Sequence, residues 1–219
     1  MTLVPPSFLL RVSYPCRFLA QMPRSDDDRL LDLPDEHRLE NFAAMDGRPS
    51  FADLRLAWND AGLGLQLEVR GKDQQPQGDA SRPRASDGLT VWLDTRDART
   101  SHRASRYCLQ FHFLPTGGGP DHDEPAFSQS AIHRALQDAP TCSTADMALR
   151  SRVKKTGYLI EAFLPAAVLN GFDPEQNPRL GFFFAVRDAE LGDHLLSGSA
   201  EFPYWEDPTL WSVLELKKD

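Results

Sequence analysis

Charged and imidazole side chains gather near the middle of the chain, between residues 94 and 106. Arg96, Asp97, His102 and Arg103 follow a stretch in which apolar and polar residues alternate. Guanidinium, carboxylate and imidazole groups are planar donors and acceptors, which is the chemistry that a ligand rich in polar groups requires. We therefore interpret this loop as a candidate ligand-binding segment. The alternative is that Arg96, Asp94 and Asp97 form ion pairs that only support the loop.

Three more polar side chains lie on predicted strands. Gln110 and His112 share the polar face of residues 107–113, and Glu161 is the polar exception in the apolar stretch 158–164. Period-two alternation places each on a defined face of its strand. We include all three among the candidate ligand-binding residues, while His112 could equally be a hydrogen-bonded structural histidine.

Catalysis has little support in the sequence. Neither a GxSxG nor an HExxH motif is present, and no pair of carboxylates can be placed across a cleft. Cys108 and His112 would lie about 13 Å apart along a strand, too far for a nucleophile and its base. We favour a protein that is not an enzyme.

Two alternating stretches flank the charged loop. Residues 87–94 place leucine and valine on one side and Thr90, Trp92 and Asp94 on the other. Trp92 therefore shares its face with polar residues, so it is either half exposed or covered by the N-terminal segment. Further strands are predicted from alternation or from continuous apolar runs: 51–58, 63–70, 107–113, 158–164, 180–186 and 211–216.

These strands predict a single all-β domain, an antiparallel, jelly-roll-like β-sandwich with long loops and short helices at most. Residues 8–20 predict an edge strand that Pro15 ends, and residues 21–50 an acidic surface segment with one short helical turn at most. We expect residues 1–50 to pack on the sandwich. The run Asp26–Asp28 lacks the spacing of a calcium loop and is interpreted as a solvated charge run.

The net charge of −8 over 219 residues argues against nucleic acid or an anionic membrane as partner. No apolar run approaches the roughly 20 residues of a membrane helix. The N-terminal residues lack a basic start followed by a continuous apolar run, so we expect no signal peptide and a cytoplasmic protein. The three cysteines contain no CxxC pair, which leaves zinc ribbons and thioredoxin-type sites unsupported. The oligomeric state is not predicted.

The ordered set of motifs resembles a known group of proteins. The hairpin that turns at Asn59–Gly62, the strand SDGLTVWLDTRD, the strand GYLIEAFLP, and LGFFFAVRD followed by a Trp-containing ending occur in this order over about residues 50–216. Together they resemble family 9 carbohydrate-binding modules and the related DOMON-like sandwiches.

This resemblance implies a saccharide ligand held between two tryptophans and hydrogen-bonded by charged and amide groups. Trp205 or Trp211 could supply one tryptophan. The other would lie in the loop before the Asp94 strand, residues 71–86, which contains no aromatic residue. We therefore expect a site with one aromatic wall, formed by Trp205.

The resemblance also implies a structural calcium ion. Acidic residues at the predicted strand ends, Asp94, Asp97 and Asp188, are the candidate ligands.

Two other hypotheses stay open. A DOMON-like domain could bind haem or a metal, and haem would need axial Met or His side chains, for which Met45, Met147, His102 and His112 are available. The third hypothesis is an interaction protein that keeps the sandwich without a ligand site.

Overall fold

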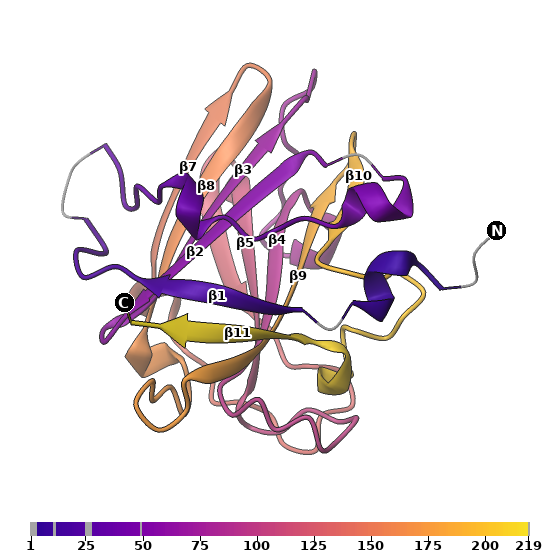
Figure 1. The fold of residues 1–219 in the computed structure, drawn as a ribbon. Coiled ribbons are helices and arrows are strands. Elements are labelled where there is room, and N and C mark those ends of the chain that lie inside the picture. The colour runs from indigo at the N-terminus through magenta and orange to yellow at the C-terminus, as the bar shows by residue number, and fades with distance from the viewer. Residues whose placement is uncertain (1–3, 11, 25–27, 49, 219) are drawn as a thin grey trace.

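The protein is described by a computed structural model in which residues 4–10, 12–24, 28–48 and 50–218 are placed (Figure 1). Its strands are β1 (Ser13–Phe18), β2 (Ala52–Asn59), β3 (Gly62–Arg70), β4 (Gly88–Asp94), β5 (Cys108–Gly118), β6 (Glu124–Gln129), β7 (Ala148–Lys154), β8 (Gly157–Pro165), β9 (Arg179–Asp188), β10 (Gly192–Leu195) and β11 (Ser212–Lys217). The helical elements are 3-10 turns of three or four residues: η1 (Pro6–Leu9), η2 (Asp35–His37), η3 (Ala43–Asp46), η4 (Pro83–Ala85), η5 (Thr144–Asp146), η6 (Ala166–Val168) and η7 (Pro208–Leu210). The all-β prediction is confirmed. No helix in the placed residues is long and apolar enough to cross a bilayer.

The strands form one strongly curved sheet in the order β6-β5-β4-β9-β11-β1-β2-β3-β8-β7, and β10 pairs with residues 185–188 of β9, beyond those that pair with β11. The two outer strands β6 and β7 contact each other, so the sheet curls into two facing halves, a nearly closed sandwich. The inward faces of both halves supply one core, which includes Leu54, Leu56, Leu65, Leu67, Val91, Phe111, Phe113, Ile160, Phe182 and Phe184. Every second residue of β4, β5 and β9 points into this core, and the residues between them lie on the opposite, outer face of the sheet.

Strand β1 differs from the edge strand predicted for this segment. It lies between β11 and β2 and runs parallel to both, across the front of the molecule in Figure 1. Pro15 lies inside the strand rather than at its end. This is possible because β2 pairs only with Arg17 and Phe18, so at Pro15 the strand has β11 on one side alone.

The segment before β2 was predicted to be an acidic surface stretch, but it buries a row of apolar residues. Met22, Leu30, Leu31 and Leu33 pack on the outer face of β2 and β8, in a second apolar cluster that includes Phe163. Two 3-10 turns, η2 and η3, replace the single turn expected. Asp26 and Asp27 lie outside the placed residues.

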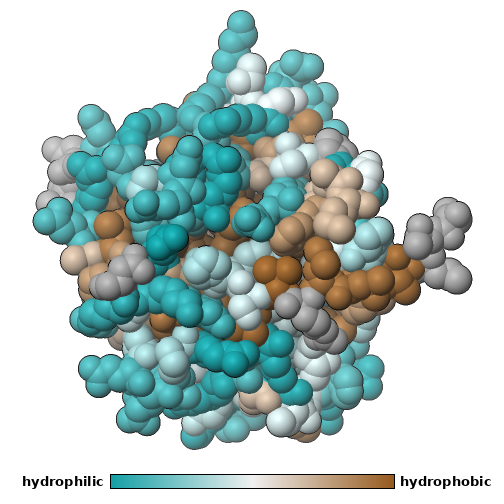
Figure 2. Space-filling model, viewed as in Figure 1, coloured by the Kyte–Doolittle hydropathy of each residue, from teal (hydrophilic) through white to brown (hydrophobic). Residues whose placement is uncertain are grey.

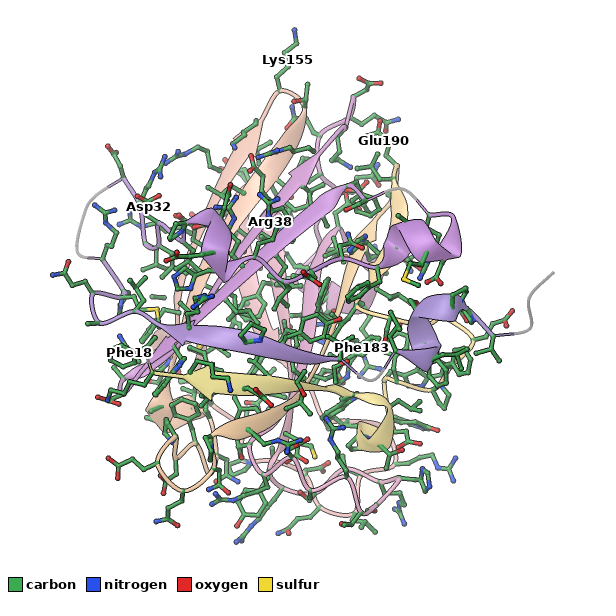
Figure 3. All side chains as sticks on the ribbon, viewed as in Figure 1. Phe18, Asp32, Arg38, Lys155, Phe183 and Glu190 are labelled. Carbon is green, nitrogen blue, oxygen red and sulfur yellow. The ribbon has the colours of Figure 1, made fainter. Side chains whose placement is uncertain are left out.

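A buried lysine holds the loop between β3 and β4 in place. The ammonium of Lys72 lies 2.6 Å from Asp188, 3.3 Å from Asp87 and 3.6 Å from Glu190. Lys72, Asp87 and Asp188 are almost completely buried. Figure 3 marks Glu190 in the turn between β9 and β10, so this ion network joins the loop to that turn.

The surface seen in Figure 2 is largely hydrophilic, and a hydrophobic stretch follows the N-terminal segment. Leu9 and Leu10 are exposed there, and Phe8 stacks on Phe202.

Candidate ligand-binding site

A pocket of about 330 Å³ opens on the outer face of β4, β5, β9 and β10. Its lining combines aromatic, amide, imidazole and charged side chains: Arg84, Thr90, Trp92, Gln110, His112, Ala185, Arg187, Asp193, Leu195, Tyr204 and Trp205. A second hollow of about 220 Å³ lies beside η1 and β11. Its two arginines, Arg99 and Arg179, are both paired with Asp97, so they have less capacity left for a ligand.

Strand alternation and register bring the floor of the first pocket together. Trp92 lies opposite Gln110 on β5, and Thr90 lies opposite His112 on β5 and Ala185 on β9. Because the core takes every second residue of these strands, the residues between them face outward as a continuous row.

Two polar atoms of the floor have no hydrogen-bond partner among the placed residues. They are the indole Nε1 of Trp92, a donor, and the amide Oε1 of Gln110, an acceptor. Trp92 is 4% exposed and Gln110 is 2% exposed. A buried polar atom without a partner costs about 1–3 kcal/mol, so these two atoms are the candidate hydrogen-bonding groups of the pocket floor.

A hydrogen-bonded histidine sets the orientation of Gln110. Nδ1 of His112 lies 2.9 Å from Oγ1 of Thr90, and its Nε2 lies 2.9 Å from Oγ of Ser130 and 3.3 Å from Nε2 of Gln110. Burial, and then the charge of Arg84, lower the pKa of His112 to about 4, so the ring is neutral at pH 7. Neutral Nε2 accepts from the amide of Gln110, which leaves Oε1 of Gln110 for a ligand.

Trp205 forms the exposed aromatic wall of the pocket. It is 38% exposed and meets Tyr204 edge to face, with ring centroids 5.4 Å apart. Tyr204 in turn stacks on Phe183 at 4.5 Å and covers Trp92. Trp92 is therefore covered by Tyr204 rather than by the N-terminal segment.

Trp211, the other tryptophan considered for this wall, is 1% exposed. Its Nε1 donates to the carbonyl of Tyr204 at 2.8 Å. Trp211 thus positions the backbone that carries the aromatic wall and does not reach the pocket.

The charged loop singled out from the sequence does not line this pocket. Arg96 lies over the ring of Tyr107, His102 bonds Asp207 at 2.8 Å, and Arg103 donates to two backbone carbonyls. These side chains hold the loop by contacts within the protein.

Glu161 lies on the outer face of β8, in the other half of the sheet, and accepts the backbone N–H of Leu30 at 3.2 Å. Burial raises its pKa. Its contact is with the N-terminal segment, so of the seven predicted ligand-binding residues the structure brings together Gln110, His112 and Trp205.

The three carboxylates predicted to bind calcium do not meet. Asp94 pairs with Gly181 near the start of β9, whereas Asp188 ends that strand. Asp94 accepts the backbone N–H groups of Arg96 and Ala98, and burial raises its pKa.

The other two carboxylates face cations of the chain itself, Asp97 with Arg99 and Asp188 with Lys72. Within the placed residues, no three His, Cys, Asp or Glu side chains gather as metal ligands. These carboxylates therefore do not fit a calcium site, and calcium binding by this chain stays a prediction.

Sequence reasoning missed the charged rim of the pocket: Arg84, Arg187 and Asp193. Arg187 shares strand parity with Ala185, which is a signal for the outer face. Arg84 and Asp193 come from the short turn η4 and the short strand β10, neither of which has a periodic pattern that would reveal it.

Comparison with known proteins agrees with this architecture. Residues 33–219 match the family described as carbohydrate family 9 binding domain-like. A family 9 carbohydrate-binding module from Caldicellulosiruptor kristjanssonii in complex with glucose aligns with a TM-score of 0.64 and 15% identity, over 95% of this chain and 97% of that one.

The module from that organism in complex with cellotriose gives a TM-score of 0.60 at 15% identity, over 95% of each chain. The curated proteins contain no match. At this identity the two structures establish the fold, and the family match covers most of the chain. The chain therefore belongs to the carbohydrate family 9 binding domain-like family.

Proposed function

We propose that this protein is a non-catalytic carbohydrate-binding module and that the pocket beside Trp205 is its saccharide site. The observation that carries the proposal is the pair of unpartnered buried atoms in the floor, Nε1 of Trp92 and Oε1 of Gln110. One is a donor and the other an acceptor, and a sugar hydroxyl is both at once. The related modules bound to glucose and to cellotriose support this choice of ligand class.

The same geometry explains how a sugar would be held. Its C–H face would lie on the exposed ring of Trp205, and one ring hydroxyl would donate to Gln110 and accept from Trp92. With a single aromatic wall, stacking contributes about 1 kcal/mol beyond the burial of area. We therefore propose micromolar to millimolar affinity.

Binding on a glycan array, followed by calorimetric titration of the glycans that bind, tests the proposal. Trp205→Ala should lower the affinity about tenfold, which corresponds to 1.4 kcal/mol. Val153→Ala on β7 is the control, since Val153 is 37% exposed but lies in the other half of the sheet. Gln110→Ala should weaken binding similarly by removing the free acceptor.

The proposal fails if no glycan binds, or if Trp205→Ala and Gln110→Ala bind as the parent chain does. The interaction protein without a ligand site would then be the better hypothesis.

A DOMON-like haem site fits the placed residues poorly. Both ring nitrogens of His112 are hydrogen-bonded, and His102 is bonded to Asp207. Neither Met45 nor Met147 lines the pocket. An absorption spectrum of the purified protein tests this alternative, because bound haem gives a Soret band.

A further inference from the structure

We propose that the pocket is built for an anionic saccharide, one whose ring carries a carboxylate or a sulfate, and that Arg187 and Arg84 receive that charge. The inference rests on the proposed function, because it names the ligand class of the same pocket.

Arg187 is the first support. It lies on the outer face of β9, is exposed and lines the pocket. Its guanidinium has no hydrogen bond, ion pair or aromatic contact with the placed residues, whereas arginines elsewhere are held by carboxylates, such as Arg55 by Asp53. All five N–H donors of its guanidinium are therefore free to bind a ligand.

The neighbouring carboxylate does not neutralise this arginine. Asp193 on β10 lies directly opposite Arg187 in the strand register and lines the same pocket. Directly opposite residues of antiparallel strands are close enough for an ion pair. No oxygen of Asp193 lies within 4.0 Å of the Arg187 guanidinium, so this pair is not formed.

Arg84 supplies a second positive charge. It reaches the pocket from η4 and makes only two long hydrogen bonds, 3.5 Å to Oγ of Ser130 and 3.4 Å to the carbonyl of Ala131. It has no carboxylate within 4.0 Å among the placed residues. Two arginines and one aspartate thus line the pocket, an excess of one positive charge in a chain whose net charge is −8.

The excess positive charge favours an anion by two physical effects. A carboxylate or sulfate accepts two parallel N–H groups of one guanidinium, and such charge-assisted bonds are roughly twice as strong as neutral ones. A hydroxyl of a neutral sugar carries no charge of its own and does not offer two parallel acceptor oxygens to the guanidinium. We therefore expect an acidic sugar to bind at least tenfold tighter than its uncharged counterpart.

The decisive comparison uses one sugar with and without its charge. Four glycosides are titrated into the protein, and binding is followed by NMR chemical shifts. They are methyl β-glucuronide, the methyl ester of its carboxyl group, methyl β-glucoside and the 6-sulfate of methyl β-glucoside. The ester keeps the shape of the glucuronide and removes the charge. The glucuronide and sulfate arms show which acidic group is preferred.

Arg187→Gln and Arg84→Gln should each reduce the preference for the acid over the ester to less than threefold. Arg96→Gln is the matched control, because it removes the same charge from a side chain that lies over Tyr107 outside the pocket. It should leave the preference unchanged, and raising the salt concentration should weaken the acid alone.

Equal affinity for acid and ester, or a preference that survives both substitutions, would overturn the anionic site. Binding of neutral glycosides in that case would leave the carbohydrate-binding proposal intact. If none of the four glycosides and no glycan on the array binds, both proposals fall together.

Discussion

Replacing Lys72 by methionine should destabilise the protein strongly. The substitution keeps most of the side-chain volume but removes the ammonium from between Asp188 and Asp87, at 2.6 and 3.3 Å. Both carboxylates would then be buried without a counter-charge. Breaking a buried ion pair in this way costs about 3–5 kcal/mol, a large part of the 5–15 kcal/mol that holds a typical domain folded.

Urea unfolding followed by tryptophan fluorescence measures this loss. With an m-value of about 2.5 kcal/mol/M, the midpoint should fall by about 1–2 M. Lys154→Met is the matched control, since Lys154 is 42% exposed and pairs with Glu68 at the surface, and its loss should stay below about 1 kcal/mol. A loss below 1 kcal/mol in Lys72→Met would refute this account.

Three further predictions concern pH, backbone strain and metal. Burial, and then the charge of Arg48, lower the pKa of His194 to about 4, so its contribution to stability is present above pH 6.5 and is lost as the pH falls toward 4, by about 2 kcal/mol at pH 5. His194→Gln should flatten the profile of unfolding free energy against pH in this range, and an unchanged profile would contradict the prediction. Gly157→Ala should lower the melting temperature more than Gly47→Ala, because both glycines have positive φ but only at Gly157 would a Cβ overlap a backbone atom, the carbonyl oxygen of Val69. Equal decreases in melting temperature would argue against this overlap. The calcium prediction is checked by thermal melting of the protein in EDTA and in calcium. If EDTA lowers the melting temperature and calcium restores it, other residues form a metal site. Identical melting curves would count against any such site.

The sequence was most informative where strand alternation was strict. In β4 and β5 it placed Trp92, Gln110 and His112 on the outer face, and these residues form the pocket floor. Strands β6 and β10 were missed because they are short and pair along only one side, so few of their residues are buried and no alternation marks them.

The remaining differences come from tertiary contacts that residue type cannot reveal. Arg96 and Arg103 have the chemistry of binding residues, but nearby partners in the same fold occupy them. Leu30, Leu31 and Leu33 lie in an acidic segment without periodicity, and they are buried because the outer face of β8 presents Phe163 to them. In both cases the deciding contact is set by the folded chain and not by residue type.

The position of β1 has a consequence for how the chain acquires its fold. Ser13 pairs with Val213, so the strand that links the two halves of the sheet depends on a partner 200 residues away in sequence. Contacts at such separation require a large loop to close before they contribute, and domains rich in them fold slowly. During synthesis, residues 13–18 must wait for β11 to leave the ribosome, and until then the β2 side of the curved sheet lacks its bridge to β9.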